Sequence, residues 1–183
     1  MAIFKYADRK YLTSKDLKNL IYYAANPQKC LTIHSNMLYQ EDCSLIATQW
    51  LYFHTYHHKM NQNLALQYIL TFDFKTESNL LSLFTLNDIA QSICKLNCFK
   101  DTNLFITLHK STASQPEHFH IIVDTINKVS GNQVFIPHNN LTSQIGKILE
   151  SHSIALAGYG GYINNTNFFQ YGNLSPSLLY FAV

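Results

Sequence analysis

The feature that restricts the fold most is a pair of apolar segments, residues 104–109 and 118–126, joined only by the polar segment 110–117. Both segments are rich in Ile, Leu, Phe and Val, residue types that are enriched in strands or typical of buried cores. A link this short cannot contain the crossover that parallel neighbours require, so it favours an antiparallel hairpin. We therefore expect a sheet built around this hairpin.

The flanking sequence predicts further strands and helices. Residues 66–74 alternate, with Tyr68 on one face and Gln67 on the other. Ser14 is a suitable N-cap for a first helix, which Asn26-Pro27 ends. The other expected strands are 2–6, 30–35 and 133–136, and the other expected helices are 41–58, 87–97 and a segment around 141–149. In the 41–58 helix, the apolar spacing places five side chains roughly on one side, Leu45, Ile46, Trp50, Phe53 and His57.

These elements predict an α+β fold, an α/β sandwich with a mainly antiparallel sheet of about five strands and flanking helices, largely on one face. A length of 183 residues is one that a single core usually fills, so we expect one domain over 1–183. Residues 155–183 are rich in Gly, Asn, Tyr and Phe and fit either an extra hairpin or a segment packed over the sheet.

The apolar runs are far shorter than the roughly 20 residues of a membrane-spanning helix, so no membrane insertion is expected. Residues 1–10 carry charges where a signal peptide needs an apolar stretch, which predicts a cytoplasmic location.

Three histidines of the hairpin are expected to converge. A period of two places His118 and His120 on one face of their strand, and His109 projects opposite to the apolar set of the neighbouring strand. Neutral imidazoles are good ligands for divalent metals, and three of them leave positions open for substrate oxygens. Asp124 and Asn127 are expected either to orient a metal ligand by hydrogen bonding to it or to orient a phosphate. The alternatives are partly buried structural histidines and, for Asn127, an ordinary turn.

A tyrosine pair, Tyr22 and Tyr23, lies on the first expected helix. A rotation of about 100° per residue places Tyr23 at the border of the apolar stripe and Tyr22 farther toward solvent. A border position suits a ring that packs below and presents its hydroxyl to a cleft. Ordinary aromatic packing is the alternative.

Together, three segments resemble the tyrosine relaxases of the HUH endonuclease superfamily, which act in conjugative mobilisation. In residues 16–29 a helix bearing Tyr-Tyr leads into an Asn-Pro-Gln-Lys turn, and residues 63–72 form a strand ending in Thr-Phe. Residues 118–127 contain a His-x-His motif, an apolar strand and an Asn, with His109 upstream. The likeness covers about residues 2–154, which leaves 155–183 as an extension of unclear structure.

The resemblance implies an HUH nuclease-like fold and a metal-dependent enzyme that nicks one DNA strand at a transfer origin, for mobilisation of a plasmid or integrative element. Tyr23 would be the nucleophile of a transesterification through a 5′-phosphotyrosine, and His109, His118 and His120 would hold the metal. Mn²⁺ or Mg²⁺ is favoured over Zn²⁺, Co²⁺ or Ni²⁺. The implied partners are single-stranded DNA, relaxosome accessory proteins and a coupling protein.

Two other functions remain open at this point. One is a rolling-circle replication initiator with the same chemistry, and the other is a non-catalytic, DNA-binding relaxosome accessory protein. A net charge of +2 and a pI near 8.3 permit an anionic partner without requiring one. Candidate DNA contacts are the aromatic or basic side chains Tyr22, Lys29, Tyr56, Tyr68 and Lys110, with core packing as the alternative for Tyr68.

Overall fold

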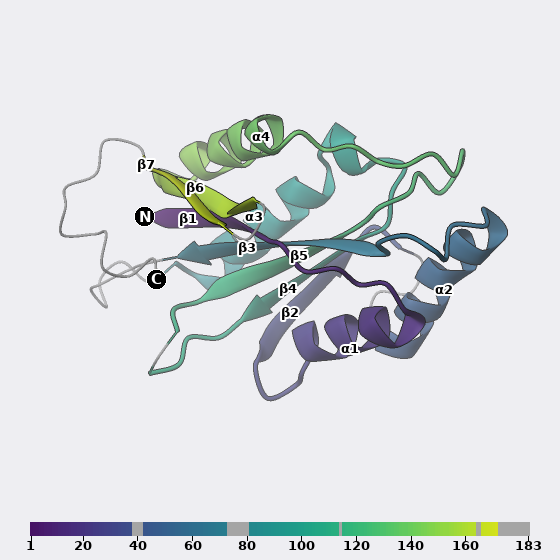
Figure 1. The fold of residues 1–183 in the computed structure, drawn as a ribbon. Coiled ribbons are helices and arrows are strands. Elements are labelled where there is room, and N and C mark those ends of the chain that lie inside the picture. Colours follow the sequence, from purple (N-terminus) through teal and green to yellow (C-terminus); the bar gives the residue numbers. More distant parts are fainter. Residues whose placement is uncertain (38–41, 73–80, 114, 164–165, 172–183) are drawn as a thin grey trace.

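A seven-stranded sheet forms the centre of the fold, in the order β2-β4-β5-β3-β1-β6-β7 (Figure 1). The computed structural model describes residues 1–37, 42–72, 81–113, 115–163 and 166–171. The strands are β1 Ala2–Ala7, β2 Cys30–Ser35, β3 Ala65–Phe72, β4 Leu104–His109, β5 His118–Asp124, β6 Leu156–Ile163 and β7 Thr166–Tyr171. All neighbouring pairs are antiparallel except β1 and β6. The α+β class is confirmed, with more strands than the five expected.

The additional strands come from the C-terminal segment. β6 lies parallel to β1, and β7 returns antiparallel to β6. The extra hairpin predicted as one alternative for 155–183 is therefore present, whereas 164–165 and 172–183 lie outside the described residues. The sequence signal was weak because β6 is rich in Gly, a residue type depleted in strands.

Helices cover both faces of the sheet (Figure 1). They are α1 Ser14–Ala24, α2 Cys43–Tyr56, α3 Leu83–Cys94 and α4 His138–Ser151. α1 and α2 share a core with Phe105 and Ile122, whereas α3 and α4 share another with Ile106 and Phe119. Because successive strand residues point to opposite faces, these cores lie on opposite sides of β4 and β5. The expectation of helices largely on one face is therefore wrong.

The predicted helix ends shift by a few residues. Thr13, not Ser14, caps α1: its hydroxyl accepts a hydrogen bond from the backbone N–H of Asp16, whose carboxylate accepts one from the Thr13 N–H. Asp42 caps α2, so this helix is shorter than 41–58, and Glu41 lies outside the described residues. Ser82 caps α3, which begins four residues before the predicted 87 and ends at Cys94.

The buried side of α2 also differs from the prediction. Leu45 is 42% exposed, and His57 is only partly buried. His54 is fully buried in their place, because its ring hydrogen bonds to Asp124 in β5. A polar ring with a hydrogen-bond partner can be buried at low cost, and hydrophobic spacing alone does not reveal that partner.

The predicted strand limits hold for β2 and β4 and shift by one or two residues in β1, β3 and β5. β4 has the predicted limits, and β5 pairs with it antiparallel but ends at Asp124 rather than at 126. Residues 133–136 are not a strand, since only Gln133 forms an isolated bridge, with Ile126. β3 ends at Phe72, and the predicted residues 73–74 lie outside the described part of the chain. Among the described helices, none is long and apolar enough to cross a bilayer.

Candidate functional site

The β4–β5 pairing brings the three predicted histidines together. His109 is directly opposite His118 in the register, and His120 follows two residues later on the same face. Each histidine offers one ligand nitrogen, and these nitrogens all lie within 4.8 Å of one another. All three side chains are buried. The hairpin therefore forms a compact cluster of imidazoles.

Hydrogen bonds aim the free ring nitrogens of two of these histidines. Nε2–H of His109 donates to the Ala24 carbonyl at 2.7 Å, and Nδ1–H of His118 donates to the Pro116 carbonyl at 2.8 Å. A carbonyl only accepts, so one nitrogen of each ring keeps its lone pair. Nδ1 of His120 lies 2.9 Å from Nε2 of Gln67, and its own buried Nε2 has no hydrogen-bond partner among the described residues. This donor set fits a divalent metal ion.

Burial keeps these imidazoles neutral. Burial is the main cause that lowers the pKa of His109 and His118 below the usual histidine value. Burial, with the neighbouring His109 and His118, lowers the pKa of His120 to about 3. The rings are therefore unprotonated at neutral pH, and that is the form that binds metals.

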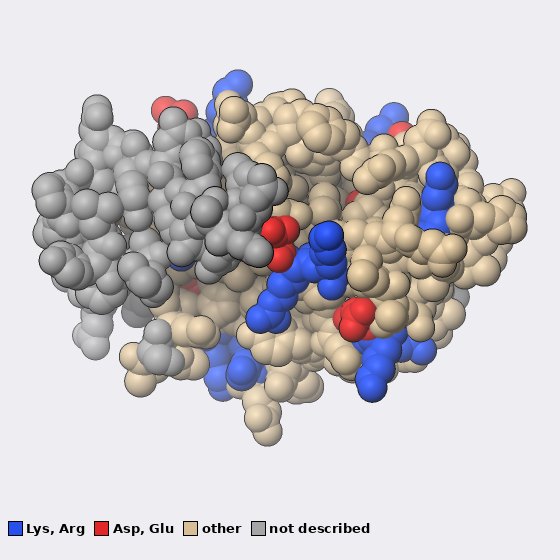
Figure 2. Space-filling view, in the orientation of Figure 1, with Lys and Arg blue, Asp and Glu red and all other residues tan. Residues whose placement is uncertain are grey.

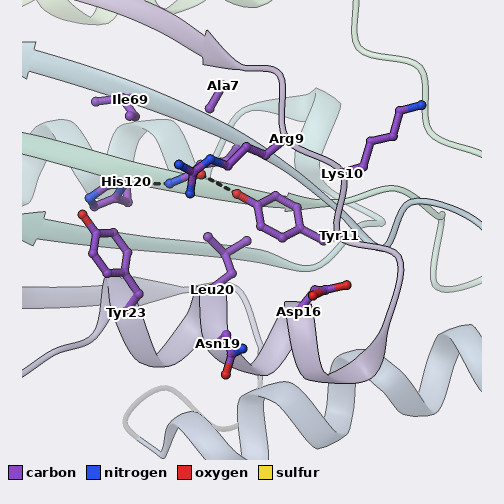
Figure 3. Close-up of a pocket in the computed structure, with 11 residues that line it drawn as sticks. Ala7, Arg9, Lys10, Tyr11, Asp16, Asn19, Leu20, Tyr23, Ile69 and His120 are labelled. Carbon is purple, nitrogen blue, oxygen red and sulfur yellow. Dashed lines mark hydrogen bonds between the residues drawn. The ribbon is translucent and has the colours of Figure 1, made fainter.

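Tyr23 approaches this cluster from the end of α1. Its ring centroid lies 5.5 Å from the His120 ring and 5.9 Å from the His109 ring, in edge-on geometry. Figure 3 shows its hydroxyl pointing toward His120. The side chain is 48% exposed, so the cluster and the hydroxyl meet at the surface. The capped helix α1, with Leu20 and Ala24 buried beneath it, holds the tyrosine in place.

A pocket opens beside Tyr23 (Figure 3). Its lining comes from the β1–α1 connection, α1, β3 and β5. Arg9 reaches into it, whereas Lys10 points away from His120. Tyr11 donates a hydrogen bond to the oxygen of Gln67 at 2.6 Å on the pocket wall. No role was predicted for Arg9, Tyr11 or Gln67; only the alternation of 66–74 hinted that Gln67 shares a sheet face with the histidines.

The predicted DNA contacts divide into two groups. Lys29 lies beside the cluster, with its ammonium 5.4 Å from the Tyr23 ring centroid, and its backbone carbonyl accepts a hydrogen bond from Lys110 N–H. Lys110 is exposed immediately after His109, and Tyr22 is exposed on α1. These three side chains remain available to a ligand near the cluster.

The other two aromatic candidates are placed elsewhere. Tyr68 is fully buried and stacks on Phe4 on the opposite face of β3, so the prediction of a DNA contact is wrong and core packing is its role. Tyr56 is exposed at the end of α2, two residues after His54, whose ring hydrogen bonds to Asp124. Asp124 is the last residue of β5, so Tyr56 lies near the strand end opposite the histidine cluster.

The two residues expected to orient a metal ligand do not touch the cluster. Asp124 shares the face of His120, but four residues separate them, about 13 Å along a strand. Its carboxylate instead accepts hydrogen bonds from His54 and Asn103, each at 2.7 Å. The Asn127 side-chain oxygen accepts from two backbone N–H groups of the following turn. Asp124 and Asn127 are therefore structural, contrary to prediction.

Charge is dispersed on the face of the molecule that Figure 2 shows. Figure 2 shows Lys and Arg side chains scattered over one face, with acidic side chains beside several of them and no continuous basic stripe. This agrees with the small net charge of the chain. A nucleic-acid ligand would therefore be held by a few local contacts.

Comparison with known protein families matches residues 22–151 to the nuclease domain of the MobA/VirD2-like relaxases. The match contains Tyr23 and all three clustered histidines and covers well over half of the chain. Comparison with curated proteins and with solved structures gave no match. The chain thus belongs to the MobA/VirD2-like relaxase nuclease family, whose members nick DNA in mobilisation.

Proposed function

We propose that this chain nicks one strand of a transfer origin by transesterification, with Tyr23 as nucleophile and His109, His118 and His120 as holders of a divalent metal ion. The observation that carries the proposal is the meeting of Tyr23 with the imidazole cluster, at ring distances of 5.5 and 5.9 Å. A hydroxyl there can reach a phosphate that rests against the cluster.

The reaction exchanges one phosphodiester for another. The Tyr23 hydroxyl loses its proton, and its oxygen bonds to the scissile phosphorus. The bond from phosphorus to the 3′ oxygen breaks, and that oxygen takes up a proton. The products are a free 3′-hydroxyl and a 5′-phosphotyrosine. Because one ester bond forms as another breaks, the step is reversible and permits later rejoining.

A phenol, with a pKa of about 10, is a poor nucleophile at neutral pH and needs nearby positive charge. A bound metal ion would supply part of that charge and would neutralise the phosphate oxygens. Lys29, at 5.4 Å from the Tyr23 ring, adds a fixed positive charge beside the nucleophile. Of the two ions expected, three nitrogen ligands favour Mn²⁺ over Mg²⁺, which prefers oxygen ligands.

Single-stranded DNA is the proposed ligand of the pocket beside Tyr23. The pocket is open, is lined by Arg9 and leads to His120, so a strand crossing it would bring a phosphate to the cluster. Relaxosome accessory proteins and a coupling protein are proposed as further partners.

The test is covalent capture of DNA. Purified protein is mixed with Mn²⁺ and a pool of 3′-labelled single strands of randomised sequence, and adducts are resolved on a denaturing gel. We expect a slow-migrating adduct that requires Mn²⁺ and is absent for Tyr23→Phe, which loses only the hydroxyl. Tyr22→Phe is the matched control and should retain the adduct.

Two outcomes would contradict this assignment. An adduct that persists in Tyr23→Phe but disappears in Tyr22→Phe would move the nucleophile by one residue. No adduct from the wild type, with DNA binding retained, would favour the non-catalytic accessory role.

A further inference from the structure

His120 differs from the other two clustered histidines in how its second ring nitrogen is held. Backbone carbonyls accept from His109 and His118, and this determines which nitrogen of each ring carries the proton. Nδ1 of His120 instead lies 2.9 Å from Nε2 of the Gln67 side-chain amide, whose Oε1 accepts from the Tyr11 hydroxyl. An amide offers both a donor and an acceptor, so the Gln67 orientation decides the His120 tautomer.

Tyr11 holds the other end of this amide. Its hydroxyl lies 2.6 Å from Gln67, and both side chains are buried. A hydroxyl can donate to the amide oxygen or accept from the amide nitrogen, so this contact is satisfied in either orientation. Tyr11 thus restricts Gln67 to two orientations, related by a half-turn of the amide, that impose opposite tautomers on His120.

We infer that Gln67 is a positioning residue that prepares His120 for the metal, an inference that rests on the metal site of the proposed function. With the amide oxygen toward His120, Nδ1–H donates to Gln67 and the Nε2 lone pair faces the cluster. With the amide nitrogen toward His120, the ring proton sits on Nε2 instead. Nε2 is buried and has no hydrogen-bond partner among the described residues, so that N–H would be unsatisfied and would block a metal.

The first orientation therefore serves both the free and the metal-bound site. It differs by a half-turn of the amide from the orientation in the structure, in which Gln67 Nε2 faces His120 and Oε1 faces Tyr11. Losing a side chain that hydrogen bonds to the outer nitrogen of a metal-binding histidine typically lowers metal affinity by about 10- to 100-fold. Removing the hydrogen bond from Gln67 should lower affinity by a factor in this range and should leave the other two ligands in place.

The experiment uses Co²⁺ as the probe, because its visible absorption reports the ligands directly. Wild type, Gln67→Met, Gln67→Glu and Tyr11→Phe are titrated with Co²⁺. Gln91→Met is the matched control, because Gln91 is exposed on α3, whose core lies on the other face of the sheet. Side-chain ¹⁵N NMR of the metal-free proteins reports which nitrogen of His120 carries the proton.

We expect Gln67→Met to bind Co²⁺ about 10- to 100-fold more weakly and to raise the share of His120 protonated on Nε2. Gln67→Glu should bind at least as tightly as wild type, because a carboxylate only accepts. Tyr11→Phe should show a smaller loss in the same direction, and it carries the test if Gln67→Met does not fold. Gln91→Met should behave as wild type.

Equal Co²⁺ affinity and an unchanged tautomer in both Gln67→Met and Tyr11→Phe would overturn this inference alone. A wild type that binds no Co²⁺ would overturn the metal site itself and the inference with it. The two failures are therefore distinguishable.

Discussion

At the scale of single residues, the buried pair of His54 and Asp124 stabilises the fold at the end of β5, whereas His118 and His120 at the start of the same strand belong to the candidate metal site. The Asp124 carboxylate is fully buried and accepts hydrogen bonds from the His54 ring, the Asn103 amide and the Ile126 N–H. Three donors around one carboxylate satisfy a charge that burial would otherwise penalise. The pair ties α2 to the end of β5, so its contribution is to the fold.

Asp124→Asn is expected to destabilise the protein while leaving metal affinity unchanged. The new amide nitrogen must face a donor, and a buried donor without an acceptor costs about 1–3 kcal/mol. Urea unfolding measures the first effect and Co²⁺ titration the second. Lower Co²⁺ affinity at unchanged stability would restore the predicted role of Asp124 at the metal site.

The clustered histidines can be predicted from local sequence, whereas the roles of Gln67 and Asp124 cannot. Alternation along 118–126 and a short link to His109 were sufficient to bring the three histidines to one point. Gln67 and Asp124 acquire their roles from Tyr11 and His54, which lie on distant segments. Local periodicity says which face a side chain occupies, but not which distant side chain will dock against it.

At the scale of elements, α1 matters because it carries Tyr23 at its last turn. Its start is set by a capping box in which Thr13 and Asp16 satisfy each other's backbone N–H groups. The sequence pattern predicts Ser14 as the N-cap, but Ser and Thr are both favoured there, so residue type alone does not distinguish Ser14 from Thr13. Only the backbone geometry places Thr13 outside the helix and Ser14 inside it.

Thr13→Ala should therefore cost about 1 kcal/mol of unfolding free energy, whereas Ser14→Ala should change it by a few tenths at most. Chemical denaturation of the two variants measures the difference. The reverse ranking would identify Ser14 as the cap.

Among the strands too, local sequence predicts some elements well and others poorly. Those with alternating or continuous apolar sequence were predicted nearly to their ends, because each buries side chains against a helix layer. For the β6–β7 pair, the sequence predicts either a hairpin or a segment packed over the sheet, because a Gly-rich sequence has few side chains to indicate which face is buried. Residues 133–136 follow the turn at Asn127 and pair with a neighbouring segment only through a single bridge. Whether a segment pairs along its length depends on the order of strands in the sheet, which its own sequence does not reveal.

At the scale of the whole molecule, a net charge of only +2 implies weak attraction to DNA apart from local contacts, and charge is dispersed on the face shown in Figure 2. Arg9, the single arginine of the chain, lines the pocket with Tyr23. Arg9→Gln should weaken binding to a single-stranded oligonucleotide and reduce the slope of log affinity against log salt by about 0.7, the value for one phosphate contact. Fluorescence anisotropy at several salt concentrations measures the slope.

Lys147→Gln is the matched control for that experiment, since Lys147 is exposed on α4, whose core lies on the other face of the sheet. An equal change of slope in both variants would show that Arg9 contributes only to the overall charge.

The imidazole cluster also governs how the metal-free fold responds to acid. An unfolded histidine titrates near pH 6.5, whereas burial holds the pKa of folded His120 at about 3. Between these values the unfolded chain binds a proton that the native chain does not, so the free energy of unfolding falls as pH drops. At pH 5 this single ring accounts for a loss of about 2 kcal/mol.

We therefore expect the thermal midpoint of the metal-free wild type to fall from pH 7 to pH 5, with a shallower fall in His120→Gln. The comparison is between slopes, because the substitution also changes the midpoint at pH 7. Burial also lowers the pKa of His109 and His118, so the variant keeps part of the dependence. Saturating Mn²⁺ should raise the wild-type midpoint at pH 7, since a ligand that binds only the native state stabilises it. Parallel pH profiles for wild type and His120→Gln would mean that His120 is protonated as readily in the fold as in the unfolded chain, which its burial among two other imidazoles argues against.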